Sequence, residues 1–70
     1  MFMKKINQEE LYIFISNFYI QYGIVPAVGF LAGYYKVTLQ AIRNHLEDLA
    51  KQKRIKLILK NERVTNYKLK

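Results

Sequence analysis

The chain has 70 residues, which is enough for one domain with a small hydrophobic core. Hydrophobic residues make up 51% of it, which excludes a disordered tail, and it has no cysteine, which excludes disulfides and thiolate metal sites. Twelve Lys and Arg stand against five Asp and Glu, and this surplus favours a polyanionic partner, nucleic acid before an anionic membrane surface.

The N-terminal segment, residues 1–6, places two lysines before an apolar stretch, as a signal peptide does. Four polar residues at 7–10 interrupt that stretch, and no small-residue cleavage site follows. No apolar run approaches the roughly 18 residues of a membrane span. We therefore expect a cytoplasmic protein that does not bind membranes.

The first predicted helix runs from about Gln8 to Tyr22, with Asn7 as its N-cap and Gly23 at its end. One apolar stripe contains Leu11, Phe14, Ile15, Phe18 and Tyr22. Other apolar residues lie off this stripe, so the helix is apolar around more of its circumference than one small core requires. Two interpretations stay open. The helix is clamped between core and hairpin, or it forms a dimer surface that contains Tyr12, Ile13, Tyr19 and Ile20.

The segment after the first helix leads into a second one. Residues 23–25 are too short for an independent strand, and we expect them to add a third strand to a sheet formed elsewhere. Pro26 opens the second helix, Ala27 to about Tyr34, because a proline in the first turn lacks only an N–H that has no helical partner. Gly29 and Gly33 are poor helix formers that either allow close helix packing or end the helix early.

The third predicted helix, about residues 38–53, has Thr38 as its N-cap and a clear amphipathic pattern. Its apolar positions recur at helical spacing: Leu39, Ile42, Leu46, Leu49 and Ala50. Its outer face begins with Gln40, Arg43 and Asn44, whose side-chain types hydrogen-bond base edges and phosphates. In a basic chain, this pattern predicts a DNA recognition helix.

The C-terminal residues, about 55–69, predict a β-hairpin, because two segments rich in strand formers flank the turn-sized Asn61-Glu62-Arg63. The fold class is therefore mainly α with a small β-hairpin (α+β). The order of elements is helix, short strand, helix, helix, strand, strand, as in a winged helix-turn-helix. The outward lysines of the hairpin are either phosphate contacts or edge charges that guard against aggregation.

Several segments together carry a family resemblance: Pro26-Ala27-Val28, Leu31-Ala32, residues 38–49 and Arg54-Ile55. Over roughly Tyr22 to Leu59, about half of the chain, the sequence resembles the N-terminal DNA-binding domain of LexA-type repressors and, more loosely, GntR- and MarR-type winged helices. The resemblance implies that base edges are contacted by Gln40, Ala41, Arg43 and Asn44. The chain departs from the family at Lys36, where many members have glycine, and at Gly29 and Phe30, which replace a polar pair. The self-cleavage domain of LexA-type repressors is absent, so we expect no autoproteolysis.

Another set of residues is predicted to contact the DNA backbone or to act in the wing: Lys36, Thr38, Lys53, Lys56, Lys60 and Arg63. Glu47 lies near the same face and would repel phosphate. The single histidine, His45, lacks partners at ligand spacing, so we expect no metal and no cofactor. No catalytic arrangement is recognisable either, and we expect neither an enzyme nor a small-molecule ligand.

The sequence therefore predicts a small transcriptional regulator, a repressor from a phage or mobile element, that binds double-stranded DNA as a homodimer. The alternative is a protein–protein interaction module, or a replication or partition accessory factor, on the same fold. In that case the aromatic first helix would be the partner surface, through Tyr12, Phe14, Phe18 and Tyr19.

Overall fold

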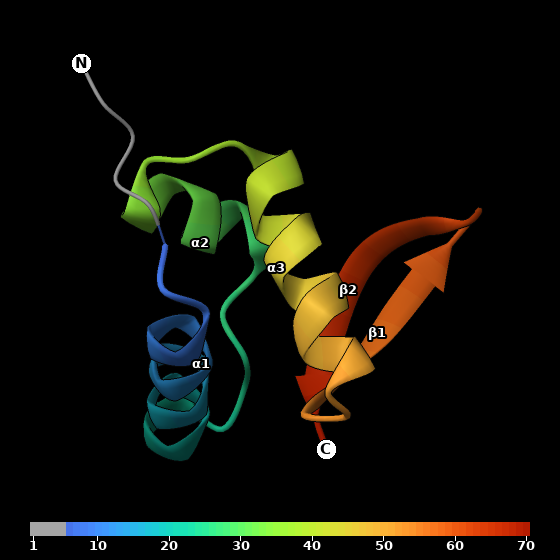
Figure 1. The fold of residues 1–70 in the computed structure, drawn as a ribbon. Coiled ribbons are helices and arrows are strands. Elements are labelled where there is room, and N and C mark those ends of the chain that lie inside the picture. The colour runs from blue at the N-terminus through green and yellow to red at the C-terminus, as the bar shows by residue number, and fades with distance from the viewer. Residues whose placement is uncertain (1–5) are drawn as a thin grey trace.

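A computed structural model describes residues 6–70 as three helices followed by a two-stranded antiparallel hairpin (Figure 1). The elements are α1 (Gln8–Tyr22), α2 (Val28–Tyr35), α3 (Leu39–Lys51), β1 (Ile55–Lys60) and β2 (Arg63–Leu69). The predicted α+β class is confirmed, and the layout is winged-helix-like. In Figure 1, α1 and the hairpin stand at opposite sides of the molecule with α3 between them. Residues 1–5, where the signal-peptide interpretation was weighed, lie outside the described part.

Helix α1 has the bounds that its capping residues predict. The Asn7 side-chain oxygen accepts hydrogen bonds from the backbone N–H groups of Glu9 and Glu10, at 2.9 and 3.2 Å. Gly23 ends the helix with a φ of 78°, and its N–H donates to the Tyr19 carbonyl at 2.7 Å. Glycine adopts this left-handed conformation without steric cost.

The segment between α1 and α2 differs from the prediction. The expected strand at 23–25 is wrong, because the sheet of the described residues contains only β1 and β2. Pro26 is buried at the end of this link, and its carbonyl accepts a 2.5 Å hydrogen bond from the Tyr67 hydroxyl. A side chain of the hairpin therefore satisfies the backbone group of this link.

Helix α2 is shifted by one residue from the prediction and ends at Tyr35, so Gly33 does not end it early. Lys36 follows in the left-handed conformation, with φ 58° and ψ 48°. The chain thus makes the turn for which the LexA-type pattern has glycine, although a side chain there costs roughly 1–2 kcal/mol. The departure at Lys36 leaves the turn between α2 and α3 intact.

Helix α3 begins as predicted and ends two residues earlier. The Thr38 hydroxyl accepts a hydrogen bond from the Ala41 N–H at 3.1 Å. At the other end, Lys53 has a φ of 62°, and the Arg54 N–H returns to the Leu49 carbonyl at 3.1 Å. This left-handed turn closes the helix at Lys51 and directs the chain into β1.

The predicted hairpin is confirmed, with Ile55 opposite Leu69 and Leu57 opposite Tyr67. Its two-residue turn, Asn61-Glu62, has φ values of 54° and 63°, as in a type I′ turn. A register shift lies between Ile58 and Leu59.

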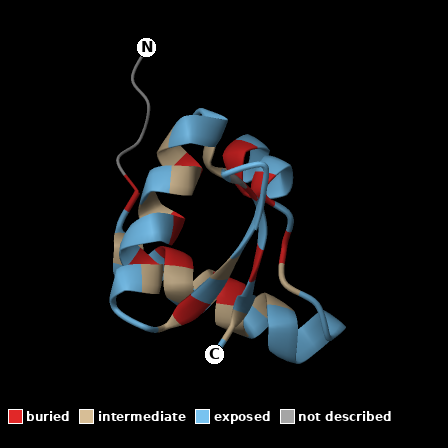
Figure 2. Ribbon diagram, turned by 90° about the vertical axis from the view of Figure 1, so that its right-hand side faces the viewer, coloured by how far each residue is buried: buried red, intermediate tan, exposed pale blue. Residues whose placement is uncertain are grey.

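The core is formed by the facing sides of the helices and one side of the hairpin, where the buried positions gather in Figure 2. Side chains of all three helices and of the hairpin take part: Leu11, Ile15, Leu31, Ile42, Leu46, Leu49, Ile55 and Tyr67. Successive strand residues point to opposite faces, so the alternate hairpin residues are left on an outer, solvent-facing side.

Candidate nucleic-acid interface

Charge is distributed very unevenly along the chain. Residues 11–35, which include most of α1 and all of α2, contain no charged residue. In α3, Arg43 and Lys51 are balanced by Glu47 and Asp48. Residues 52–70 carry seven Lys and Arg against a single Glu. The positive surplus therefore belongs to the hairpin and to the turn before it, and only slightly to the predicted recognition helix.

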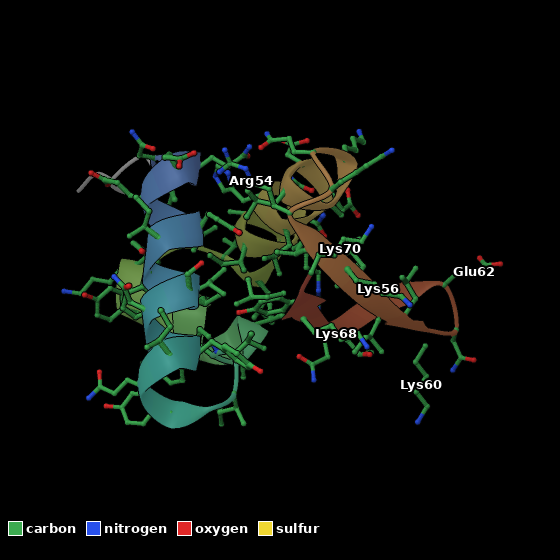
Figure 3. The ribbon with its side chains drawn as sticks, turned by 90° about the horizontal axis from the view of Figure 1, so that it is seen from below. Arg54, Lys56, Lys60, Glu62, Lys68 and Lys70 are labelled. Carbon is green, nitrogen blue, oxygen red and sulfur yellow. The ribbon has the colours of Figure 1, made fainter. Side chains whose placement is uncertain are left out.

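The outer side of the hairpin concentrates exposed lysines. Lys56 of β1 lies directly opposite Lys68 of β2. Lys60 is the last residue of β1, and Lys70 follows directly after β2; both are exposed. We call Lys56, Lys60, Lys68 and Lys70 the basic face. Figure 3 shows three of these side chains along the hairpin and Lys60 near its tip. Like charges directly opposite each other destabilise a strand pair, so this arrangement costs the fold stability.

Arg54 is not a free member of this set. Its guanidinium lies 2.6 Å from the Glu9 carboxylate and 4.8 Å from the centre of the Tyr12 ring. These contacts connect the start of the hairpin to the first turns of α1. Arg54 therefore positions the hairpin, and its charge is already paired within the molecule.

The predicted base-contacting residues differ in their exposure to solvent. Gln40 and Asn44 are exposed, and the Gln40 amide nitrogen donates to the Asn44 side-chain oxygen at 2.9 Å. Ala41 is half-buried. Arg43 is also half-buried, and its Nε is buried without a hydrogen-bond partner. The amides of Gln40 and Asn44 are therefore accessible to a ligand, whereas the Arg43 side chain lies against the protein up to its Nε atom.

Arg43 lines a groove of about 830 Å³ between α3 and the hairpin. Apolar side chains of the strands, Leu57, Leu59 and Val64, form part of its lining. The charged residues of its lining are Arg43, Lys51, Glu47 and Glu62, which balance one another. The groove is therefore open and close to neutral, and Glu47 shares it with Arg43, near the predicted reading face.

The predicted backbone-contacting residues are separated by the structure. Lys36 precedes α3 and Lys53 follows it, so the length of a 13-residue helix, about 20 Å, lies between them. The Thr38 hydroxyl is engaged in its cap. Lys56 and Lys60 lie together on the basic face, whereas for Arg63 the structure gives only the backbone, opposite Lys60. Lys68 and Lys70 were not among the predicted backbone-contacting residues, although the alternation of the last strand predicts that they face outward.

The predicted dimer residues are divided as well. Tyr12 is half-buried beneath Arg54, whereas Ile13, Tyr19 and Ile20 are exposed. His45 is half-buried, with its Nδ1 3.2 Å from the Gln8 side-chain oxygen, and so connects α3 to α1. Among residues 6–70, no three His, Cys, Asp or Glu side chains assemble as metal ligands do. In the same part of the chain, no helix has the length and apolarity needed to cross a bilayer.

We compared the chain with known protein families, curated proteins and solved structures. No family model matches it, and no curated protein or solved structure matches it either.

Proposed function

We propose that this protein binds double-stranded DNA and acts in the cytoplasm as a small transcriptional regulator, a repressor. The observation that carries the proposal is the basic face, where Lys56 and Lys68 oppose each other without a neutralising carboxylate in their register. Two lysines held in this way repel each other, and an anionic partner relieves that repulsion. A phosphate backbone supplies closely spaced negative charges along its length.

The two parts of the interface would have different tasks. The basic face would bind phosphates and supply affinity without sequence preference. The exposed amides of Gln40 and Asn44 would read base edges, since Asn and Gln pair with the N6 and N7 atoms of adenine in the major groove. Arg43 would contact a base only after its guanidinium leaves the groove beside the hairpin, so we assign it a secondary part.

Repression would follow from occupancy. One recognition helix reads only a few base pairs, and two copies on a palindromic site would double the sequence that is read. A bound pair would exclude polymerase from an overlapping promoter. The resemblance to winged-helix families over roughly Tyr22 to Leu59 supports this function independently of the charge distribution.

The test is the salt dependence of DNA binding. Each neutralised phosphate contributes about −0.9 to the slope of log K against log salt. The double variant Lys56→Ala/Lys68→Ala should therefore flatten the slope by about 2 and weaken binding to every duplex. As a control, Lys51→Ala removes one charge from α3, where Glu47 stands four residues earlier and offsets it. It should leave the slope close to that of the wild type.

Sequence preference is tested separately by selecting bound duplexes from a random pool. Asn44→Ala should relax the preference at one base pair with little change in the salt slope, because it removes a base contact and no charge. If the hairpin double variant binds DNA with the wild-type slope, the proposed role of the basic face is wrong.

A further inference from the structure

A ladder of aromatic rings joins α1 to α2 on the side of the molecule away from the basic face. The Phe14 ring stacks on Tyr34 with their centres 4.7 Å apart, and Tyr34 lies 6.1 Å from Phe30. Phe18 continues the ladder, 5.7 Å from Phe30 and 4.6 Å from Tyr22. We call these five residues the aromatic face.

Much of the aromatic face is open to solvent. The exposed fractions are 49% for Phe30, 58% for Tyr34 and 60% for Tyr22. The rings of Phe14, Phe18, Tyr22 and Phe30 surround a shallow hollow of about 270 Å³, together with the amides Asn17 and Gln21. Large apolar side chains exposed next to one another are typical of a surface that binds a partner.

The helix backbone beside the rings is open as well. Gly29 and Gly33 lie one turn apart on α2, directly before Phe30 and Tyr34 in the sequence, and no other part of the described molecule lies within 4 Å of a Cβ built at either position. Glycine lowers the stability of a helix. Within the monomer, no close packing contact at Gly29 or Gly33 compensates for this loss. They leave the surface of α2 accessible to the close approach of another helix.

We infer that the aromatic face joins two copies of this chain. Electrostatic repulsion elsewhere on the chain favours this surface for contact with a second copy. The chain carries a net charge of +7, and the stretch 11–35 that forms this face is uncharged. A second copy that approached through residues 52–70 would bring seven further Lys and Arg against the same seven. A symmetric contact through the uncharged parts of α1 and α2 avoids this juxtaposition of cations.

The available area fits a small, reversible dimer. A whole aromatic side chain covers about 150–250 Å², so the exposed parts of Tyr22, Phe30 and Tyr34 supply roughly 300 Å². Ile13 and Ile20, 48% and 79% exposed, share one side of α1 with Asn17 and extend the surface. A standard interface buries about 800 Å² from each partner, so this smaller surface should give a weak dimer with a dissociation constant in the micromolar range or above.

The predicted dimer surface would take part in this contact only in part. Ile13 and Ile20 would lie at its edge, whereas Tyr12 would stay within each copy beneath Arg54. Because α1 and α2 lie away from the hairpin in Figure 1, pairing through these helices would leave both basic faces accessible. The dimer does not rest on the proposed DNA binding, and it is tested without DNA.

The experiment is sedimentation of the 70-residue protein over concentrations that span the expected dissociation constant. The wild type should change from monomer to dimer as the concentration rises. Tyr34→Lys and Phe30→Lys each place two lysines at the interface of a dimer and should raise the dissociation constant at least ~100-fold. The matched control Ile58→Lys adds the same charge at an exposed apolar residue of the hairpin and should leave it unchanged. Circular dichroism confirms that each variant compared is folded.

A wild type that remains monomeric at every concentration overturns the inference. A dimer that survives both α2 variants overturns it too, as does a dimer that Ile58→Lys disrupts to the same extent. If either α2 variant unfolds, Gly33→Leu replaces it, because this variant fills the open surface of α2 without adding charge. Loss of the dimer in these variants with unchanged binding to a single DNA half-site separates this inference from the proposed function.

Discussion

The hydrogen bond between Tyr67 and Pro26 is a buried polar contact between the hairpin and the link that leads into α2. Tyr67 is 1% exposed, and its hydroxyl donates to the Pro26 carbonyl at 2.5 Å. Tyr67→Phe keeps the ring in the core and leaves this buried carbonyl without its partner. An unsatisfied buried acceptor costs about 1–3 kcal/mol. A 70-residue domain has roughly 4–10 kcal/mol of stability in total, so the loss should be readily measured.

The assay is urea unfolding followed by circular dichroism. The slope of the free energy against urea is about 1 kcal/mol per molar for a small domain, so the midpoint for Tyr67→Phe should fall by roughly 1–3 M at neutral pH. Tyr22→Phe is the matched control, because that ring is largely exposed and its hydroxyl has no partner within residues 6–70. Its midpoint should stay near that of the wild type.

The difference in stability between the wild type and Tyr67→Phe should also depend on pH, in a direction that the pKa of Tyr67 sets. Burial raises the pKa of Tyr67 well above its ordinary value of about 10. Below pH 10 the phenol is neutral in both the folded and the unfolded chain, and its full contribution to stability is present. Above pH 10 the unfolded chain ionises first, so this contribution is lost as the pH rises towards the folded-state pKa. The advantage of the wild type over Tyr67→Phe should therefore shrink above pH 10. A variant as stable as the wild type at neutral pH would refute the reasoning.

Three further substitutions, in a turn, at a helix cap and within a helix, should each change the free energy of unfolding, as measured with urea. Glu62→Gly should stabilise the hairpin by about 1 kcal/mol, because the type I′ turn holds Glu62 at a φ of 63°, and a destabilised variant would contradict the turn assignment. Thr38→Ala should cost about 1 kcal/mol through loss of the cap on Ala41, whereas Thr38→Ser should retain most of it. Gly33→Ala should stabilise the monomer by about 0.5–1 kcal/mol, since the added methyl group meets open space; a loss of stability would show that α2 needs the glycine.

Local chemistry explains which parts of the fold the sequence predicted well. The bounds of α1 follow from Asn7 and Gly23, whose side-chain cap and left-handed turn involve neighbours within a few residues. The start of α3 follows from Thr38 in the same way. The hairpin was found because a polar turn separates two segments rich in strand formers. In each case the deciding interactions are close in sequence.

Long-range contacts explain the rest. The expected strand at 23–25 depended on a distant partner, and the structure instead provides the Tyr67 hydroxyl for the Pro26 carbonyl. The amphipathic pattern placed Arg43 on the outer side of α3, but it could not show that the hairpin folds back beside it and half-buries its side chain. Lys56 could be placed opposite Lys68 only once the register of the two strands was known. The aromatic face could be identified only from the packing of α1 against α2, because its rings come from both helices.

The backbone amide signals of the protein during titration with a DNA duplex test the central claim most directly. The account predicts that signals shift along β1 and β2 with any duplex, and that Gln40 and Asn44 shift further with a duplex recovered by selection. Signals from the outer sides of α1 and α2 should stay in place at a concentration where the protein is in one oligomeric state. Shifts confined to α1 and α2, with β1, β2 and α3 unaffected, would contradict the assignment of the DNA interface.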